Sequence, residues 1–586
     1  MRVERIRQRP VPDQVPALAG YSPLSCRLLA SRGLSGPADT LRLAELLPPD
    51  DLKDAEAAAR LLLDALQAGV PMVIVGDYDV DGAASTALMV RALRDGFGAQ
   101  VDYFIPSRFT QGYGLSPAVV EAVQAQSPEL PRLLITVDNG IASHAGIAAA
   151  QALGMRVIVT DHHLPGDQPC SADAVVNPNQ PGCAFPSKVA CGCTVAFYVL
   201  LVLRRLAADW LTEQGREAPN LADYLDLVAL ATIADVVPLD GNNRILVEQG
   251  LRRLRAGAAR PGILALLEAA GRDPTRLTSQ DLGFVLGPRL NAAGRMDDMT
   301  IGVACLLTDS MEDARALAAM LEEFNQARKQ VQNRMVDQAT GLLVQAEGLL
   351  KQQGAEDSAE PARVRVLWHA DWHEGIVGLV AGRLKERLQK PVVALCQGDN
   401  GLWKGSARSI PGVHIRDLLA WVDAREPGLI RQFGGHAMAA GLSLEEDSLP
   451  RLRSRLQDAA AALVPEEAWV AELTVDGSLN GEQFGLQQAE ELTRLGPWGQ
   501  GCPLPLFCNA FRVVQQRWLG GRHLKLVLQP EDDNRTLDAI WFFCPLDPET
   551  SLPEVVSLVY ELAVNEFRGQ KAPQLIIRAE VPAELI

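Results

Sequence analysis

The sequence lacks the features of a secreted or membrane-embedded protein. Its ten cysteines are spread over 586 residues and none stands in a Cys-x-x-Cys pair, which is typical of reduced thiols in a cytosolic protein. The N-terminal residues contain no apolar signal core, and the longest apolar run, residues 195–203, is too short to span a bilayer. We therefore expect a cytoplasmic protein.

Positive charge is scarce as well. The net charge of -17 argues against a protein that coats nucleic acid through a generally basic surface, although it is compatible with a local basic channel. The other proportions, 48% hydrophobic and 22% charged residues, are ordinary for a globular enzyme. The chain is too long for one hydrophobic core, so we expect about three or four domains.

The cysteines offer little as metal ligands. Cys170, Cys183, Cys191 and Cys193 are near one another in the chain, but their spacing matches no zinc pattern. A zinc site is kept only as an alternative.

Residues 72–82, MVIVGDYDVDG, are the most distinctive stretch. The β-branched apolar run at its start predicts a buried strand, and the apolar spacing after Gly82 predicts a helix. Asp77, Asp79 and Asp81 are thus expected in the turn between them, where sites form in open α/β sheets. Three carboxylates this close repel one another unless a cation or a proton neutralises them, so metal binding is the first hypothesis.

Two other structures would place acids at this spacing. A calcium-binding EF-hand loop requires a Glu at its twelfth position and a helix before it. Here the twelfth position is Leu88 and a strand is expected before the loop, which excludes the EF-hand. A solvated acidic turn without an ion remains open from this stretch alone.

Strands and helices are predicted to alternate through this part of the chain. The expected strands are 101–105, 133–137 and 157–160, and the expected helices are 51–68, 117–126 and 144–153. Such alternation implies a parallel sheet, whose strands all end at one edge. Asp138 and the string Asp161-His162-His163 follow two of these strands, and Asp235 follows a further apolar segment. Carboxylates with imidazole suit Mn²⁺ or Mg²⁺, and the ligands suffice for two ions.

The strings GDYDVDG, VDNG, TDHH and TIADVVPLDGNNR resemble, in order and separation, the four motifs of the DHH phosphoesterase superfamily. Over nearly its full length the chain is similar to the branch of bacterial exonucleases that degrade single-stranded DNA from the 5′ end. The metal ligands that this resemblance implies are Asp79, Asp81, Asp138, His162 and Asp235. His163 would support the metal site and contact phosphate. Some relatives carry a ligand histidine where this chain has Val75, so the role of Asp77 as a further ligand is left open.

Two polar stretches punctuated by glycine, residues 106–115 and 287–296, are expected to be loops. The candidate substrate-binding residues in them are Arg108, Tyr113, Arg289, Asn291 and Arg295. The resemblance implies that both stretches face the substrate, and the planar fork of donors on arginine matches phosphate oxygens. A surface ion pair is the alternative for any one of these arginines.

Residues 311–353 contain no proline and predict a long helix, which a polar break at 354–362 ends. We expect a connector between domains, with an ordinary core helix as the alternative. The strings WHEGIVGLVAGRL, GLWKGSARS and QFGGHAMAAGLSL then resemble the substrate-binding DHHA1 domain, and the substrate contacts implied there are Ser406, Arg408, Gly434, Gly435 and His436. Residues 363–436 hold 11 Lys or Arg against 7 Asp or Glu, which favours a phosphate track.

The C-terminal part of the chain has short β-like runs with turns between them, which predicts a small barrel. It resembles the oligonucleotide-binding (OB) domain of the family. Aromatic side chains on such a barrel can stack on bases, and we expect this of Trp518 and Trp541.

The expected fold class is therefore α/β with a C-terminal β-barrel. The expected domains are an entry segment (1–50), a DHH catalytic domain (51–310), a connecting helix and linker (311–361), a DHHA1 domain (362–465) and an OB-like domain (466–586).

The function that the resemblance implies is a metal-dependent exonuclease that degrades single-stranded DNA 5′ to 3′ into nucleoside 5′-monophosphates, in DNA repair and recombination. Catalysis would fall to Asp138, His162, His163 and Arg289 around two Mn²⁺ or Mg²⁺ ions. A monomer is expected, with a single-strand-binding protein and a helicase as partners. The alternatives are a phosphodiesterase for short oligonucleotides or cyclic dinucleotides, and a non-catalytic replication scaffold, which should have lost its metal ligands.

Overall fold

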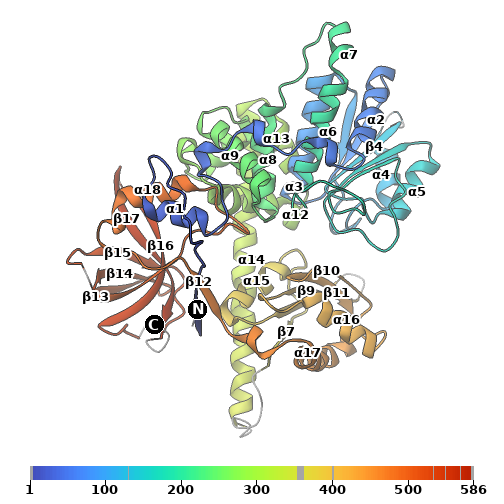
Figure 1. The fold of residues 1–586 in the computed structure, drawn as a ribbon. Coiled ribbons are helices and arrows are strands. Elements are labelled where there is room, and N and C mark those ends of the chain that lie inside the picture. Colours follow the sequence, from blue (N-terminus) through green and yellow to red (C-terminus); the bar gives the residue numbers. More distant parts are fainter. Residues whose placement is uncertain are drawn as a thin grey trace. The chain divides into compact units, whose positions relative to one another are not determined.

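The computed structural model describes residues 4–127, 129, 131–352, 362–398, 401–531, 533–547, 550–567 and 569–582. The chain forms two compact units, each made of segments that are not consecutive in the sequence. Figure 1 shows the fold coloured along the sequence. We call residues 14–326 with 493–504 the N-terminal unit, and residues 1–13, 327–492 and 505–586 the C-terminal unit. The predicted polar break at 354–362 lies outside the described residues as far as residue 361.

The N-terminal unit is built on a parallel sheet, as predicted. Its strands are β2 (Met72–Val75), β3 (Val101–Phe104), β4 (Leu133–Val137), β5 (Arg156–Thr160) and β6 (Ala174–Val176), in the order β3-β2-β4-β5-β6. Every pair is parallel, and β2 and β4 are buried along their whole length, which explains their continuous apolar runs. The carboxyl ends of these strands lie at one edge of the sheet.

The N-terminal unit also contains helices, of which some pack on this sheet and others pack on neighbouring helices. The first of them are α2 (Ala55–Ala68), α3 (Val80–Arg91), α4 (Pro117–Gln126), α5 (His144–Ala152), α6 (Gly192–Leu206) and α7 (Ala208–Glu213). They are followed by α8 (Leu225–Ala234), α9 (Gly241–Arg255), α10 (Pro261–Ala269), α12 (Gly287–Met296) and α13 (Thr300–Leu307). The helix predicted from residue 51 begins at Ala55, because Pro49–Asp51 form a separate 3₁₀ turn.

The prediction that residues 287–296 form a loop was wrong, because they form helix α12. Pro288 stands in the first turn of this helix, directly after a π-helical turn formed by Leu282–Leu286. Gly294 is required by close packing, since a Cβ there would collide with the carbonyl oxygen of Tyr78. The glycines that suggested a flexible loop thus let a helix approach the acidic turn.

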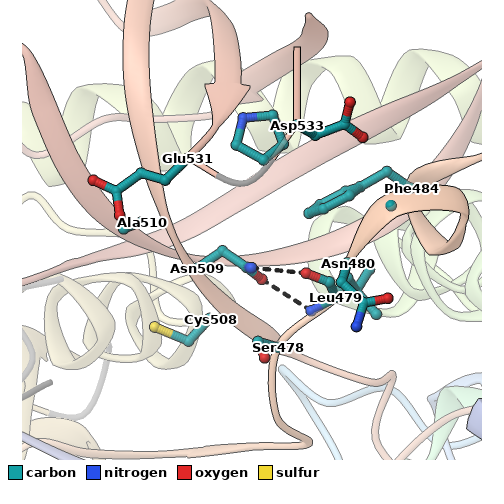
Figure 2. Close-up of a pocket in the computed structure, with 11 residues that line it drawn as sticks. Ser478, Leu479, Asn480, Phe484, Cys508, Asn509, Ala510, Glu531 and Asp533 are labelled. Atoms are coloured by element: carbon teal, nitrogen blue, oxygen red, sulfur yellow. Dashed lines mark hydrogen bonds between the residues drawn. The ribbon is translucent and has the colours of Figure 1, made fainter. Parts of the chain in front are cut away.

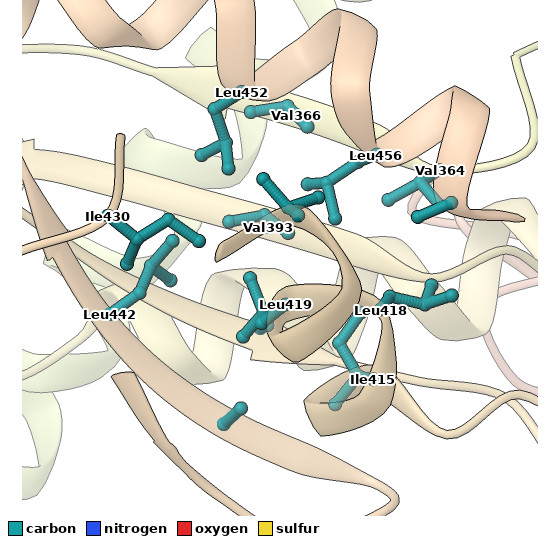
Figure 3. Close-up of a cluster of buried hydrophobic side chains, with 14 of the residues drawn as sticks. Val364, Val366, Val393, Ile415, Leu418, Leu419, Ile430, Leu442, Leu452 and Leu456 are labelled. Carbon is teal, nitrogen blue, oxygen red and sulfur yellow. The ribbon is translucent and has the colours of Figure 1, made fainter. Parts of the chain in front are cut away.

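The C-terminal unit contains a second, mixed sheet. Its strands are β7 (Arg365–Trp368), β8 (Val392–Gln397), β9 (Trp403–Arg408), β10 (Gln432–Gly435) and β11 (Ala439–Leu444), in the order β10-β11-β9-β8-β7. The associated helices are α15 (Val377–Leu388), α16 (Ile415–Arg425) and α17 (Leu449–Leu463). Side chains from the sheet, α16 and α17 form one apolar core, which includes Val393, Leu419 and Leu456 (Figure 3).

The predicted barrel is present as a closed sheet in the order β13-β14-β15-β17-β16. Its strands are β13 (Phe507–Leu519), β14 (His523–Pro530), β15 (Leu537–Trp541), β16 (Val555–Phe567) and β17 (Gln570–Val581). The run at 471–479 contributes no barrel strand, since β12 (Glu472–Val475) pairs in parallel with β1 (Arg5–Gln8). Helix α18 (Leu486–Leu495) stands between β12 and β13 in the chain.

Two further elements complete the description. Helix α1 (Pro23–Ala30) lies in the entry segment, which also contains short 3₁₀ turns. Helix α14 (Met311–Gln352) is the predicted long helix, and it passes from one unit to the other. Among the described helices, none combines the length and the apolar character that crossing a membrane requires.

Candidate metal centre

The acidic turn joins β2 to α3, at the carboxyl edge of the parallel sheet. Asp79 caps α3, because its Oδ1 accepts a hydrogen bond from the Gly82 amide at 3.1 Å. Gly82 allows the turn to close tightly, since a Cβ there would collide with the backbone of Asp77. Asp77 and Asp81 are buried and Asp79 is half-buried. The turn therefore presents its carboxylates inward, where water cannot solvate them well.

One imidazole nitrogen brings carboxylates from three separate segments together. The Nε2 atom of His162 lies 3.1 Å from Asp138 Oδ1, 3.5 Å from Asp235 Oδ2 and 3.9 Å from Asp81 Oδ2. His162 follows β5, Asp138 follows β4, and Asp235 ends α8. Segments that the sequence separates by up to 154 positions (from Asp81 to Asp235) thus converge at one edge of the sheet.

The donor atoms fall into overlapping groups, each with atoms within 4.8 Å of one another. The groups are Asp81 with His162 and Asp235, Asp138 with His162 and His163, and Asp77 with Asp79 and Asp138. Among the described residues, no cysteine belongs to such a group, which disfavours the zinc alternative.

The charges in this cluster are not balanced by the protein. Burial, and then the neighbouring carboxylate of Asp81, raises the pKa of Asp138 and of Asp235 well above the usual range. Burial, and then Asp79, does the same to the pKa of Asp77. Asp138 Oδ1, Asp235 Oδ2 and His162 Nε2 are buried atoms without a hydrogen-bond partner in the described structure. A divalent cation would satisfy all three atoms and return the acids to their ionised form.

The N-terminus of α6 supports Asp81 from behind. The backbone amides of Gly192 and Cys193 donate to Asp81 Oδ2 at 2.6 Å and to Oδ1 at 2.8 Å. These bonds and the positive end of the helix dipole favour the carboxylate form. Burial nevertheless keeps the pKa of Asp81 raised, against the opposing effect of His162. The backbone amides of Gly192 and Cys193 therefore hold Asp81 in position without a bound ion.

His163 is oriented by Asp161, which was not among the predicted site residues. Asp161 Oδ1 lies 2.7 Å from His163 Nδ1, and the buried carboxylate also accepts hydrogen bonds from the amides of Ile141, His162 and His163. Burial opposes protonation of His163, but the hydrogen bond and the charge of Asp161 outweigh it and raise its pKa to about 9. The imidazole therefore carries a positive charge near neutral pH.

Two asparagines in the motif strings also hold the centre together, and sequence reasoning did not single them out. Asn139 donates to the carbonyl oxygens of Val75 and Val137, which ties β2 to β4 directly behind the acids. Asn243 donates to the carbonyl oxygen of Pro238 in the turn after Asp235. Their presence in the motif strings was the only sequence signal for them, since their partners are backbone atoms.

The predicted substrate residues of the N-terminal unit differ in their surroundings. The Arg108 guanidinium lies 4.3 Å from the centre of the Tyr78 ring and is near enough to Asp77 to lower its pKa in part. The Tyr113 hydroxyl lies 3.2 Å from His163 Nδ1, so this side chain reaches the centre.

Helix α12 carries the remaining three. Asn291 and Arg295 are half-buried on it. Arg289 forms an ion pair with Glu322 at 2.6 Å and donates from Nη1 to the Val285 carbonyl oxygen. A phosphate bound at Arg289 would have to share or replace this ion pair.

In the C-terminal unit, Ser406 and Arg408 lie on the same face of β9. Arg408 Nη1 donates to Ser406 Oγ at 2.6 Å, and the described residues include no carboxylate within ion-pair distance of this arginine. Burial lowers the pKa of the Arg408 guanidinium. Gly378, near the start of α15, approaches both residues, because a Cβ there would lie 2.7 Å from Arg408 Nη2. A half-buried cation without a protein anion is a candidate anion site.

Gly434, Gly435 and His436 lie at the edge strand β10 and just after it. All three are exposed, and Gly435 has a φ of +136°, at which a side chain would be strained. The His436 amide donates to the Ala439 carbonyl oxygen, which closes the turn to β11. This edge of the sheet is therefore accessible from solvent.

The stacking role predicted for Trp541 does not agree with its position, because the side chain is 3% exposed inside the barrel. Trp518 is half-buried. The exposed aromatic residues at this end of β15 are Phe542 (49%) and Phe543 (67%), whose rings both pack against His523. Trp541 is the last residue of β15 and its side chain points into the barrel core, whereas the two residues after the strand are exposed.

A pocket of 230 Å³ lies elsewhere in the C-terminal unit, beside the barrel (Figure 2). Asn509 crosses it and exchanges hydrogen bonds with the backbone of Leu479, at 2.8 and 3.0 Å. Glu531 and Asp533 also line it. No predicted site residue belongs to this pocket, so it is separate from the metal centre.

Comparisons with known proteins agree with this architecture. The family model for the N-terminal domain of the DHH family matches residues 71–232, that for the DHHA1 domain matches residues 362–462, and that for the RecJ OB domain matches residues 475–579. The single-stranded-DNA-specific exonuclease RecJ of Escherichia coli is 45% identical over 578 residues, which cover 98% of each chain. Its Bacillus subtilis counterpart is 34% identical, over 98% of this chain and 70% of its own.

Solved structures give the same result. The crystal structure of RecJ from Thermus thermophilus in complex with Mn²⁺ is similar with a TM-score of 0.77 and 30% identity, over 98% of this chain and 78% of that one. The corresponding complex with Mg²⁺ gives a TM-score of 0.74 at 28% identity. The chain therefore belongs to the RecJ family of single-stranded-DNA-specific exonucleases.

Proposed function

We propose that this exonuclease degrades single-stranded DNA from its 5′ end to nucleoside 5′-monophosphates, with two divalent ions at the carboxyl edge of its parallel sheet. Hydrolysis of phosphodiester bonds follows from membership of the RecJ family and from the DHH domain. The observation that carries the site assignment is the convergence of three carboxylates on His162 Nε2, with buried atoms that lack hydrogen bonds.

The ligands proposed for the ions are Asp79, Asp81, Asp138, His162 and Asp235, with Asp77 as a further candidate. The overlap of the donor groups, with Asp138 and His162 each in two of them, supports two ions that share ligands. Such ions, when bound, would supply an activated water nucleophile and neutralise charge on the phosphate. Mn²⁺ and Mg²⁺ both suit oxygen and imidazole donors.

The protein would contribute the remaining interactions. His163, held in its charged form by Asp161, would bind a non-bridging oxygen of the scissile phosphate. Tyr113 lies beside it and would position the same nucleotide. Arg108 and Arg295 would contact phosphate oxygens, with Asn291 nearby on α12, and Arg289 would do so by exchanging its partner Glu322.

Polarity would depend on recognition of a terminal phosphate in the C-terminal unit. Arg408 is half-buried, has Ser406 as its side-chain hydrogen-bond partner, and faces no carboxylate in the described structure, which suits a dianionic 5′-phosphate. Gly434, Gly435 and His436 would contact the strand backbone at the edge of the same sheet. The exposed residues around the barrel would hold the strand further along, in the manner of OB domains.

Membership of the family also supports a role in DNA repair and recombination. A single-strand-binding protein and a helicase are proposed as partners on the same ground, because an enzyme for unpaired strands needs those strands to be generated and delivered. Action as a monomer in the cytoplasm completes the proposal.

The test is digestion of a single strand labelled at either end, with Mn²⁺, with Mg²⁺ and with a chelator. We expect mononucleotides from the 5′-labelled end, no product with the chelator, and faster cleavage of a 5′-phosphorylated strand than of a 5′-hydroxyl strand. Arg408→Gln should reduce that preference about tenfold, while Arg416→Gln, which changes an exposed arginine, should not. Release of label first from the 3′ end, or faster cleavage of dinucleotides than of long strands, would contradict the proposal.

A further inference from the structure

Residues 493–504, which we call the strap, run from the last residues of α18 to just before the barrel and belong to the N-terminal unit. The buried Arg244 of α9 donates from Nη2 to the carbonyl oxygens of Leu495 and Gly496, at 3.2 and 3.3 Å. Trp498 is buried, and the Arg32 guanidinium lies 5.5 Å from its ring centre. The strap is therefore an integral part of the unit that contains the metal centre.

The strap contacts the turn that follows Asp235. The amide of Leu239 donates to the carbonyl oxygen of Gln500 at 2.7 Å. Gly499 packs closely against the same residue, since a Cβ there would lie 2.8 Å from Leu239 Cδ1. A Cβ at Gly501 would lie 3.1 Å from Pro238 Cβ. The two glycines thus allow the strap to press directly on the turn.

This turn needs contacts from outside, because its own conformation is unfavourable. Val236, directly after Asp235, has a φ of +60° and a side chain that is 62% exposed. A β-branched residue in the left-handed region is strained and keeps this conformation only when its surroundings impose it. Asn243 holds the turn from α9 through the Pro238 carbonyl oxygen at 2.9 Å, and the strap holds the next residue, Leu239.

The strap also contacts the segment that leads to α12. Ser279 Oγ donates to the Trp498 carbonyl oxygen at 2.6 Å, and the Trp498 amide donates back to Ser279 Oγ at 3.2 Å. Ser279 begins the short helix α11 (Ser279–Asp281), which continues through a π-helical turn into α12. In that π-helical turn, Gly283 packs against Ile233 near the end of α8. The strap therefore contacts both the turn after Asp235 and the short helix α11, which leads into α12.

We propose that the strap is a positioning element for Asp235, acting through Leu239 and the turn that connects them. The inference rests on the proposed role of Asp235 as a metal ligand. It means that a segment of the chain beyond the DHHA1 domain completes the metal centre of the DHH domain. Elements that support metal ligands typically change metal affinity or activity by about 10-fold to 100-fold when they are altered.

The test uses Gly499→Ala in the full chain. The added methyl must displace Leu239, so we expect Mn²⁺ to bind about tenfold more weakly, measured from the electron paramagnetic resonance signal of free Mn²⁺. Amide hydrogen exchange should become faster in residues 235–240. Gly382→Ala is the matched control, because it adds the same methyl in α15, where no atom lies within 4 Å.

A rescue distinguishes positioning from a general loss of stability. Leu239→Val removes a methylene next to the methyl that Gly499→Ala adds, so the double variant should recover most of the Mn²⁺ affinity. If Gly499→Ala does not fold by circular dichroism, Ser279→Ala decides, since it removes both bonds to Trp498 and should also weaken Mn²⁺ binding.

The outcomes separate this inference from the proposed function. If the unaltered chain binds no Mn²⁺, the metal assignment itself fails. If the unaltered chain binds Mn²⁺ and the folded strap variants bind it equally well, with unchanged exchange at Leu239, the strap has no positioning role and the inference is overturned. A lower melting temperature with unchanged Mn²⁺ affinity would overturn it as well.

Discussion

At the scale of single residues, the candidate metal centre brings together buried groups whose charges a bound cation would balance. Asp138, Asp235 and His162 point buried atoms at one another without hydrogen bonds, and burial raises the pKa of both acids. Backbone amides already satisfy Asp81, and Asp161 already satisfies His163. Hydrogen bonds within the protein thus hold Asp81 and His163 in place, whereas a bound cation would satisfy the buried atoms of Asp138, Asp235 and His162.

His162→Ala should therefore abolish cleavage while leaving the fold and strand binding in place. Loss of a ligand should cost at least as much as loss of an outer partner, so we expect a fall in kcat of at least about 100-fold, measured with a labelled single strand. Mn²⁺ should raise the melting temperature of the unaltered chain and not that of the variant. Asp102→Ala, which removes an exposed carboxylate on β3, is the control. Near-normal cleavage by His162→Ala would show that the metal assignment is wrong.

Sequence reasoning found the residues of the centre that stand at strand ends, because a strand end is visible in the pattern. Residues 72–75 and 133–137 were predicted as strands with the bounds that the structure has. Asn139 and Asn243 were missed because they act on backbone atoms, and the sequence does not show which backbone groups will lie nearby. Asp161 was missed because its contact with the His163 side chain depends on how the chain turns after β5. Their functions stay hypotheses until they are tested.

At the scale of elements, the parallel sheet depends on how its strands begin as well as on their apolar runs. Asp173 stands directly before β6 and holds it to β5: its Oδ2 accepts from the Val157 amide at 2.8 Å, and its Oδ1 accepts from Arg156 Nε at 2.6 Å. Burial would raise the pKa of this carboxyl, but the hydrogen bonds to Val157 and Arg156 outweigh it and lower the pKa. The carboxylate form is the one that fits the sheet.

Asp173→Asn should lower the free energy of unfolding by about 1 kcal/mol at pH 7, the typical value of one such hydrogen bond. Because the pKa of Asp173 is lower in the folded chain than in the unfolded chain, its contribution is present above the unfolded pKa, near 4. The contribution is lost as the pH falls through the folded pKa. Urea unfolding of both proteins at several pH values should therefore show a difference that shrinks on acidification. A difference independent of pH would contradict this account, and Asp167→Asn, at an exposed position, should have no effect.

Other elements show where the pattern misleads. Glycines in 287–296 suggested a loop, but Gly294 serves the contact between α12 and Tyr78, so a helix forms. Trp541 and Phe542 are neighbours in the chain, yet one is buried in the barrel and the other is half-exposed, because the strand ends between them. In both cases packing, which the sequence pattern does not show, decides the local structure and which side chains face inward.

At the scale of the whole molecule, the order of the domains was predictable but the division of the chain was not. The fold class was confirmed, including the closed barrel and the second α/β sheet. The contact between the strap and the turn after Asp235 joins residues about 260 positions apart, for which neither segment carries a sequence signal. The boundaries of the predicted domains stay predictions. Residues 493–504, which were assigned to the OB-like domain, belong to the N-terminal unit.

This division changes how the role of the barrel has to be tested. A chain that ends at residue 468 loses β12, α18, the strap and the barrel, whereas a chain that ends at residue 504 loses the barrel strands alone. We expect the longer truncation product, 1–504, to cleave short strands within about threefold of the full chain and to bind long strands at least about tenfold more weakly, because base stacking on an OB domain contributes about 1–3 kcal/mol per base. The shorter product, 1–468, should in addition bind Mn²⁺ more weakly. Binding of a long oligonucleotide measured by fluorescence anisotropy and single-turnover cleavage of a short one separate the two effects. Equal affinity of 1–504 and the full chain for long strands would remove the barrel from substrate binding, and equal Mn²⁺ affinity of both truncated chains would remove the strap from the metal centre.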